Sequence, residues 1–130
     1  MKYLYLIYLD ESKMSALSED ELQAIQAEAG AHVEQLEASG RVVATEALAP
    51  VRSAATLRSR NGKLSVTDGP FAETNEQLGG FVVIEARDLN DAIQVAANDP
   101  AVRLGSVEVR PILPRPDEPA QPEGSDGSEA

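Results

Sequence analysis

Two side chains in this 130-residue chain have the chemistry of an acid–base pair. Asp68 opens the stretch "DGPF", and His32 is the only histidine of the sequence. An imidazole has an ordinary pKa of about 6.5, so it can exchange protons near neutral pH when a carboxylate orients it. We therefore take both as candidate catalytic residues, on condition that the fold brings them within hydrogen-bond reach.

Both residues also have a purely structural interpretation. In Asp-Gly-Pro the carboxylate can accept main-chain hydrogen bonds, the glycine supplies a positive φ and the proline fixes the exit of a turn. His32 lies at the edge of an apolar helical stripe, a place typical of a satisfied structural histidine. The motif could therefore be architectural, holding a hairpin in place.

The residues around this motif and at the next strand are candidate walls of a ligand pocket. Gly79-Gly80 precedes an apolar strand and not a helix, which favours a bulge or a close backbone approach over a phosphate loop. Three arginines on or near the neighbouring hairpin are expected to be solvated edge charges, and the alternative is that they grip an anionic ligand. The predicted pocket residues are Gly69, Pro70, Phe71, Gly79, Gly80 and Phe81, and the arginines are Arg52, Arg58 and Arg60.

Composition argues against several classes of function. The chain has no cysteine and one histidine, which leaves no typical zinc site, and no serine lies in a nucleophile-elbow context. We therefore predict neither a metal nor a cofactor. The formal net charge of −11 repels phosphate backbones and anionic membrane surfaces, so we expect no direct binding to nucleic acid or membrane.

The N-terminal apolar run "KYLYLIYL" is too short to be a membrane helix, which needs roughly 18 apolar residues. It ends in Asp10-Glu11 and lacks a cleavage site of small residues, which argues against a signal peptide. Together with the absence of cysteine, this predicts a soluble cytoplasmic protein.

Hydrophobic periodicity predicts the order β-α-β-hairpin-β-α-β. Ser18 and Glu21 have capping-box spacing ahead of a long amphipathic helix, and Asn61-Gly62 is a typical type I′ hairpin turn. Asp88 is expected to cap a second helix that faces inward through Leu89, Ala92, Ile93 and Ala96 and stops at Pro100. The expected strands are 2–9, 41–50, 79–86 and 105–112, the hairpin is 55–68, and the helices are 18–40 and 88–102.

This order favours a split β-α-β arrangement, an antiparallel sheet with two helices on one face. The first strand is apolar on both of its faces, and we expect Tyr3, Tyr5, Ile7, Val82 and Ile84 to be divided between the two faces of the sheet. An open apolar face would be buried by a second copy, so we predict a homodimer. Residues 1–114 form the one expected domain, and the acidic Pro-, Gly- and Ser-rich segment 115–130 is expected to be a disordered tail.

Three segments, "KYLYLIYLDE", "TDGPFAETNEQLGGF" and "GSVEVRPI", resemble the YCII-related proteins and, within them, the subgroup named for its Asp-Gly-Pro-Phe motif. The resemblance implies a ferredoxin-like α+β fold with an added hairpin that pairs into a dimeric α+β barrel. It implies a His–Asp dyad in a cleft, with Asp68 as the aspartate. When the helix end at Gly40-Arg41 is aligned, the family histidine falls near Ala29, one helical turn before His32.

Two functions follow from these observations. The first is a small-molecule-binding or regulatory homodimer, and the resemblance adds a possible link to an extracytoplasmic-function sigma factor. The alternative is a small-molecule enzyme, an acid–base isomerase or hydrolase or a cofactor-free oxygenase, that uses Asp68 and His32.

Overall fold

The computed structural model describes residues 1–117, and its centre is a four-stranded antiparallel sheet in the order β2-β5-β1-β6. The helical segments join strands that are not neighbours in this sheet, which is the arrangement of a ferredoxin-like α+β fold, as predicted. Residues 118–130, most of the predicted tail, lie outside the described part of the chain. The strands of the sheet are β1 (Lys2–Leu9), β2 (Val42–Ala47), β5 (Gln77–Glu85) and β6 (Gly105–Pro111).

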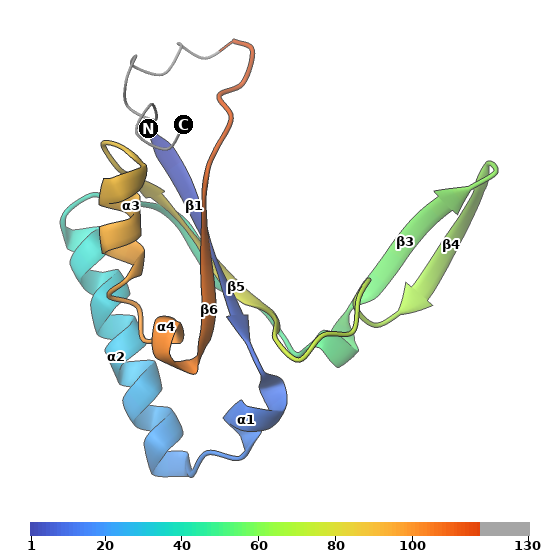
Figure 1. The fold of residues 1–130 in the computed structure, drawn as a ribbon, viewed down its shortest axis with the longest axis horizontal. Coiled ribbons are helices and arrows are strands. Elements are labelled where there is room, and N and C mark those ends of the chain that lie inside the picture. Colours follow the sequence, from blue (N-terminus) through green and yellow to red (C-terminus); the bar gives the residue numbers. More distant parts are fainter. Residues whose placement is uncertain (118–130) are drawn as a thin grey trace.

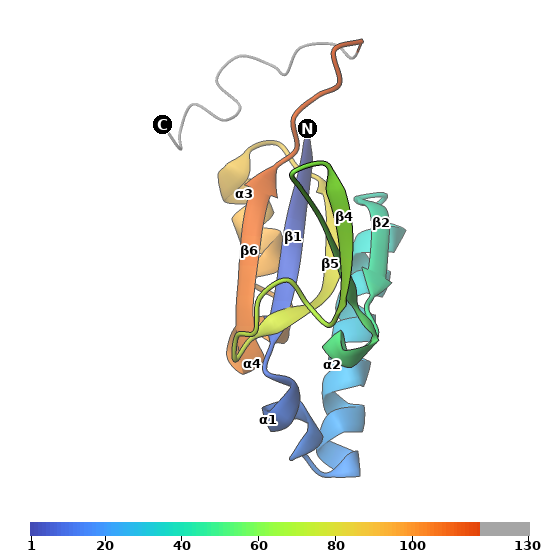
Figure 2. The same cartoon turned by 90° about the vertical axis from the view of Figure 1, so that its right-hand side faces the viewer.

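The helices cover one face of the sheet (Figures 1 and 2). The longest begins at the predicted capping box, in which Ser18 and Glu21 exchange side-chain and main-chain hydrogen bonds. Asp88 caps the next long helix by accepting a hydrogen bond from the Asp91 main-chain N–H. A short helix after the first strand was not predicted, and Asp10 caps it. The helices are α1 (Glu11–Ser15), α2 (Glu19–Ala38), α3 (Leu89–Ala96) and α4 (Ala101–Leu104).

The core lies between the sheet and the helices, and here one prediction is wrong. Tyr3 and Tyr5 pair with Ile84 and Val82 across β1 and β5, and all four side chains are buried on the same, helix-covered face. Two small residues of α3, Ala92 and Ala96, belong to the same core cluster as the two tyrosines. These four residues of β1 and β5 are therefore not divided between the two faces of the sheet, as had been expected. The core comprises Tyr3, Tyr5, Leu36, Val82, Ile84, Ala86, Ala92, Val95 and Ala96.

The opposite face of the sheet carries apolar side chains that no helix covers. Because successive side chains of a strand alternate, Leu4 and Leu6 of β1 and Phe81 and Val83 of β5 point away from the helices. All four are only half-buried. The open apolar face that was predicted therefore exists, although it consists of different residues.

A separate hairpin projects from the open side of the sheet (Figure 1). It consists of β3 (Ala55–Arg60) and β4 (Lys63–Asp68), which form their own two-stranded sheet, and the short 3-10 helix η1 (Val51–Ser53) precedes it. Asn61 and Gly62 both have positive φ, of 53° and 76°, as a type I′ turn requires. We call this hairpin the arm.

The second predicted helix differs from the observed structure. It ends at Ala96, before a turn that leads into α4, so Pro100 starts a helix and does not stop one. Ile93 was expected to face inward but is 46% exposed, and the buried position is taken by Val95 instead. None of the helices in residues 1–117 has the length and hydropathy needed to cross a membrane.

Candidate functional site

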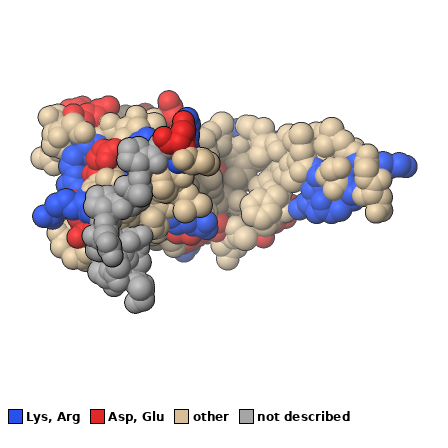
Figure 3. All heavy atoms as spheres, turned by 90° about the horizontal axis from the view of Figure 1, so that it is seen from above, with Lys and Arg blue, Asp and Glu red and all other residues tan. Residues whose placement is uncertain are grey.

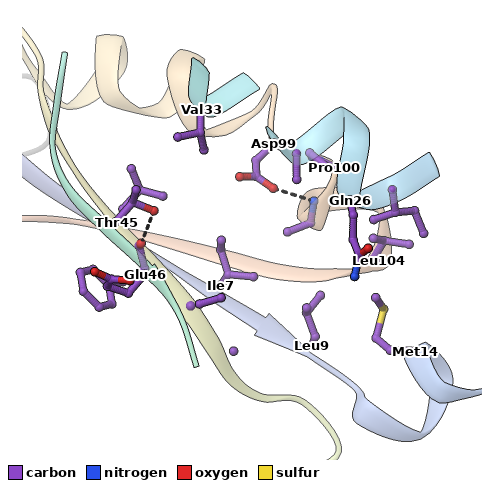
Figure 4. A pocket seen from close by; sticks show the side chains of 18 of the residues that line it. Ile7, Leu9, Met14, Gln26, Val33, Thr45, Glu46, Asp99, Pro100 and Leu104 are labelled. Carbon is purple, nitrogen blue, oxygen red and sulfur yellow. Dashed lines mark hydrogen bonds between the residues drawn. The ribbon is translucent and has the colours of Figure 1, made fainter. Parts of the chain in front are cut away.

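An apolar cavity of about 310 Å³ lies between α2 and the sheet. The apolar stripe of α2 packs into the core only at its end, at Leu36, while Leu22, Ile25, Ala29 and Val33 face the cavity. Strands β1, β2 and β5, the α3–α4 turn, α4 and Met14 of α1 supply the other walls (Figure 4). We call this space the inner cavity, and its size falls within the range of small-molecule sites.

Asp99 is the polar residue of the inner cavity that matters most for chemistry. Its side chain lies between Val33 and Pro100 at the cavity wall (Figure 4) and is only 4% exposed. One carboxylate oxygen accepts a hydrogen bond from the Ala101 main chain at 3.0 Å, and the other accepts from the Tyr5 hydroxyl at 3.1 Å. Because a carboxylate can accept about four hydrogen bonds, Asp99 retains capacity for a donor on a bound molecule.

Asp99 has no cationic partner among the described residues. Both Asp99 and its hydrogen-bond partner Tyr5 are buried away from water. Burial raises the pKa of the Tyr5 phenol far above its ordinary value, and the charge of Asp99 and the hydrogen bond to it raise the pKa further. Tyr5 therefore stays a proton donor to Asp99 over the whole physiological range. The pair is a fixed polar point in an otherwise apolar wall.

Glu46 also borders the cavity but presents its carboxylate elsewhere. It pairs with Phe81 across β2 and β5, while the neighbouring Thr45 pairs with the buried Val82. Strand alternation therefore places the side chains of Glu46 and Phe81 on the open face of the sheet, and their main chains border the cavity. Asp99 is thus the one carboxylate that faces the inner cavity from residues 1–117.

The two glycines of β5 shape the floor of the cavity. The pairing of β1 with β5 skips Gly79, since Ile7 pairs with Gly80 and Tyr8 with Leu78, so Gly79 is the bulge predicted there. A Cβ on Gly80 would lie 3.1 Å from the Glu46 carbonyl oxygen. Gly80 therefore allows the close approach of β2, and both glycines leave space that larger residues would fill.

The inner cavity adjoins a more polar space of about 620 Å³, which we call the outer cleft. The two spaces share wall residues of β1, α1, α2 and β5, namely Leu9, Met14, Leu22, Gln26 and Gly79. Residues Leu48 to Arg52 close the far side of the cleft, where the Glu11 carboxylate accepts a hydrogen bond from the Val51 main chain at 3.0 Å. A molecule could therefore extend from an apolar interior to a polar mouth.

Asp68 lies at the end of β4, at the base of the arm. Its side chain is exposed, and within residues 1–117 it has no hydrogen-bond or ion-pair partner. The predicted turn chemistry is made by main-chain groups instead: Gly69, at φ +100°, donates to the Ala54 carbonyl oxygen and accepts from the Thr56 hydroxyl. Asp68 pairs with Ala55 on the same face of the arm as Leu57 and Val66.

His32 lies on α2 and is buried, and its Nε2 atom has no hydrogen-bond partner in the described chain. Helix α2 covers one side of the sheet and the arm leaves from the other (Figure 1). No hydrogen bond joins His32 to Asp68, and neither residue lines the inner cavity or the outer cleft. The predicted acid–base pair is therefore not brought together within one chain.

Five of the six predicted pocket residues border one of two places, and Gly69 borders neither of them. Gly79, Gly80 and Phe81 border the inner cavity. Pro70 and Phe71 instead border a hollow of about 410 Å³ at the base of the arm, where Phe71 is 78% exposed.

Asp99 was missed because the predicted second helix ran through it. The buried Tyr5 was a usable signal, since a phenol in a strand covered on both sides needs a hydrogen-bond acceptor. That signal does not say which carboxylate supplies the acceptor. No group of three or more His, Asp or Glu side chains that could hold a metal ion occurs within residues 1–117.

Comparison with known proteins agrees with this architecture. The model of the YCII-related domain matches residues 1–115. The chain belongs to the YCII-related family. An uncharacterised protein of Rhizobium meliloti is 39% identical over 114 residues, which are 86% of this chain and 92% of that protein.

A solved structure of an enzyme has a similar fold. It is 5-chloro-2-hydroxyhydroquinone dehydrochlorinase from Burkholderia phenoliruptrix, in complex with 2,5-dihydroxybenzoquinone. The TM-score is 0.51 at 16% sequence identity, with 87% of this chain and 94% of that chain covered. At this identity the likeness concerns the fold.

The α2 residues near the inner cavity differ in what they present to it. Ala29 lines the inner cavity, as does Asp99, whereas His32, one turn later, does not. A carboxylate facing an apolar space without a neighbouring base can hold a hydrogen-bond donor. It lacks the second titrating group that an acid–base dyad needs.

Proposed function

We propose that this protein binds a small, largely apolar molecule carrying a hydrogen-bond donor, and that the inner cavity is the binding site. The observation that carries the proposal is Asp99, a buried carboxylate with spare acceptor capacity in an otherwise apolar wall. The ring or chain of the ligand would lie against the α2 stripe, and its hydroxyl or amino group would donate to Asp99. Small-molecule sites commonly combine such an apolar wall with a few placed polar groups.

A titration of the full chain with 4-butylphenol, followed by NMR amide shifts, tests this proposal. We expect shifts in α2, in β5 and around Asp99, and weaker binding of butylbenzene, which lacks the donor. Ala29→Leu adds bulk to the cavity wall and should weaken binding by about tenfold, equivalent to about 1.4 kcal/mol. Ala27→Leu, on the exposed side of the same helix, is the matched control and should bind as the wild type does.

The proposal fails if neither probe binds, or if Ala29→Leu and Ala27→Leu bind equally well. Circular dichroism and unfolding of both variants establish that each is folded before affinities are compared.

We further propose that the protein works as a homodimer in the cytoplasm, and that it belongs to the Asp-Gly-Pro-Phe subgroup. The open apolar face of the sheet and the exposed apolar residues of the arm support the dimer, because a second copy would remove both from water. The resemblance of "TDGPFAETNEQLGGF" to that subgroup supports a regulatory role beside an extracytoplasmic-function sigma factor. Copurification of a sigma factor with the tagged protein tests this role, and an unchanged promoter output after deletion would contradict it.

A second candidate function is enzymatic, with a hydroxylated small molecule as substrate. The fold neighbour is an enzyme whose complex holds 2,5-dihydroxybenzoquinone, and Asp99 is placed to accept a proton from a substrate hydroxyl. The catalytic roles predicted for Asp68 and His32 remain the alternative assignment. Chloride release from 5-chloro-2-hydroxyhydroquinone tests the activity: loss in Asp99→Asn alone supports Asp99, loss in Asp68→Asn supports Asp68, and no turnover by the wild type contradicts this candidate.

A further inference from the structure

Arg52 is an unpaired cation at the mouth of the candidate site. It lies in η1, its side chain is exposed, and no carboxylate or other acceptor binds it within residues 1–117. Four other arginines of the described chain do pair with acids, namely Arg41, Arg87, Arg103 and Arg110. In a chain of formal net charge −11, a guanidinium without an acidic partner beside an apolar cavity is available to bind a ligand.

Of the charged side chains of residues 1–117 that line the outer cleft, Arg52 is the one that is free to bind a ligand. Glu11 is the one carboxylate lining the cleft, and it is engaged with the Val51 main chain, next to Arg52. That bond ties η1 to α1 and so holds the segment that carries the guanidinium at the edge of the cleft. No Lys or Arg other than Arg52 lines either the cleft or the inner cavity.

Gln26 adds a second free polar group at the junction. It lines both the inner cavity and the outer cleft, and its amide makes no hydrogen bond in the described chain (Figure 4). The cleft's remaining polar side chains are committed: Ser12 donates to Asp10, Ser15 to the Ser12 carbonyl, and Gln77 to the Ala72 and Thr74 carbonyls. Gln26 and Arg52 are therefore the groups left to meet a ligand.

We propose that the ligand is an amphipathic acid, whose apolar body fills the inner cavity and whose carboxylate reaches Arg52 through the outer cleft. Arginine suits this task because its planar guanidinium matches a carboxylate with two parallel hydrogen bonds. Gln26 donates to the same end of the ligand or to its chain. This inference rests on the proposed function and names the chemical class of its ligand.

The test compares each acid of a series with its own neutral amide. The probes are ω-(4-hydroxyphenyl)alkanoic acids with three to eight chain carbons and the corresponding primary amides, which have nearly the same shape. The dissociation constants of the full chain are measured by calorimetry or NMR at low salt. We expect at least one acid to bind about tenfold more tightly than its amide, the size of effect that a charge-assisted pair supplies, and the difference to shrink with added salt.

Two matched variants locate the effect. Arg52→Gln removes the charge and should abolish the preference for the acid while the amide binds as before. Arg58→Gln makes the same change of charge on the arm, outside both spaces, and should keep the preference. Because both side chains are exposed, both variants should fold.

Failure of the inference is distinguishable from failure of the proposed function. If acid and amide bind equally to the wild type, or if the preference survives Arg52→Gln, the cavity binds ligands but Arg52 does not select an acid. If neither acid nor amide binds, the inference and the proposed function are both overturned.

Discussion

The hydrogen bond from the Tyr5 hydroxyl to Asp99 holds in place the main polar group of the candidate site. It is buried on both sides and belongs at once to the core and to the cavity wall. Neither its geometry nor its partner could be derived from spacing along the chain, because the two residues are 94 positions apart. What the sequence did indicate was a first strand that is apolar on both of its faces.

Removal of the Tyr5 hydroxyl should destabilise the protein. Tyr5→Phe leaves one oxygen of Asp99 buried without its donor, which costs about 1–3 kcal/mol in the free energy of unfolding. Tyr8→Phe is the matched control, because Tyr8 donates to the partly exposed Glu108, where water can replace the hydroxyl. Urea unfolding measures both, and equal losses in the two variants would contradict the buried role of Asp99.

Asp91 should make the free energy of unfolding depend on pH in the acidic range. Burial alone raises the pKa of this carboxyl, but the hydrogen bonds from the Arg87 main chain and guanidinium, with the charges of Arg41 and Arg87, outweigh burial and lower the pKa. A lowered folded-state pKa means that the stabilisation is fully present above the unfolded value of about 3.9 and is lost as the pH falls through the folded value.

The comparison of wild type with Asp91→Asn measures this contribution. The difference in the free energy of unfolding should be about 1–3 kcal/mol and constant between pH 5 and 7, roughly the worth of hydrogen bonds to a charged group. It should shrink as the pH falls below about 4, where the unfolded chain takes up this proton before the folded chain does. A difference that stays constant or grows in acid would show that Asp91 does not act through its charge.

At the scale of elements, local signals predicted most of the secondary structure. The capping box at Ser18, the cap at Asp88 and the Asn61-Gly62 turn all form, because each is satisfied by residues within a few positions. The division of core residues between the sheet faces could not be predicted in this way. It depends on the pairing of β1 with β5, and on two alanines of α3 that belong to the same core cluster as the two tyrosines.

Glycine substitutions in two elements should have opposite effects. A Cβ on Gly105 would overlap the Tyr8 carbonyl oxygen where β6 meets β1, so Gly105→Ala should lower the free energy of unfolding by about 1–3 kcal/mol. Gly30 lies inside α2 with nothing near its missing side chain, so Gly30→Ala should raise it by up to about 1 kcal/mol. Thermal and urea unfolding of both variants check the signs. Stabilisation by Gly105→Ala would contradict the close contact between β1 and β6.

At the scale of the molecule, the arm is the feature that a single copy does not explain. Leu57, Leu64 and Val66 share one face of it and are each more than 60% exposed, while Arg58, Arg60 and Lys63 lie on the other face. Seen from above, the basic residues gather toward the end of the arm, far from the acids of the body (Figure 3). An apolar and basic arm on an acidic protein is suited to pack against a second copy of the same chain.

A charge on the apolar face of the arm should therefore shift the oligomeric state. Val66→Asp is expected to convert the proposed dimer to a monomer at about micromolar concentration, as measured by sedimentation equilibrium, because it would bury an unpaired carboxylate. Thr67→Asp makes the same change of charge one residue along, on the other face of the arm, and should leave the dimer intact. A monomeric wild type, or equal dissociation of the two variants, would contradict the proposed pairing.

Intermolecular NOEs between 4-butylphenol and the full-length protein test most directly whether the inner cavity is the binding site. We expect contacts from the ligand to Ile25, Ala29 and Val33 of α2 and to Ala101, which would place its hydroxyl at Asp99. Contacts to Pro70 and Phe71 at the base of the arm, without contacts to α2, would contradict it.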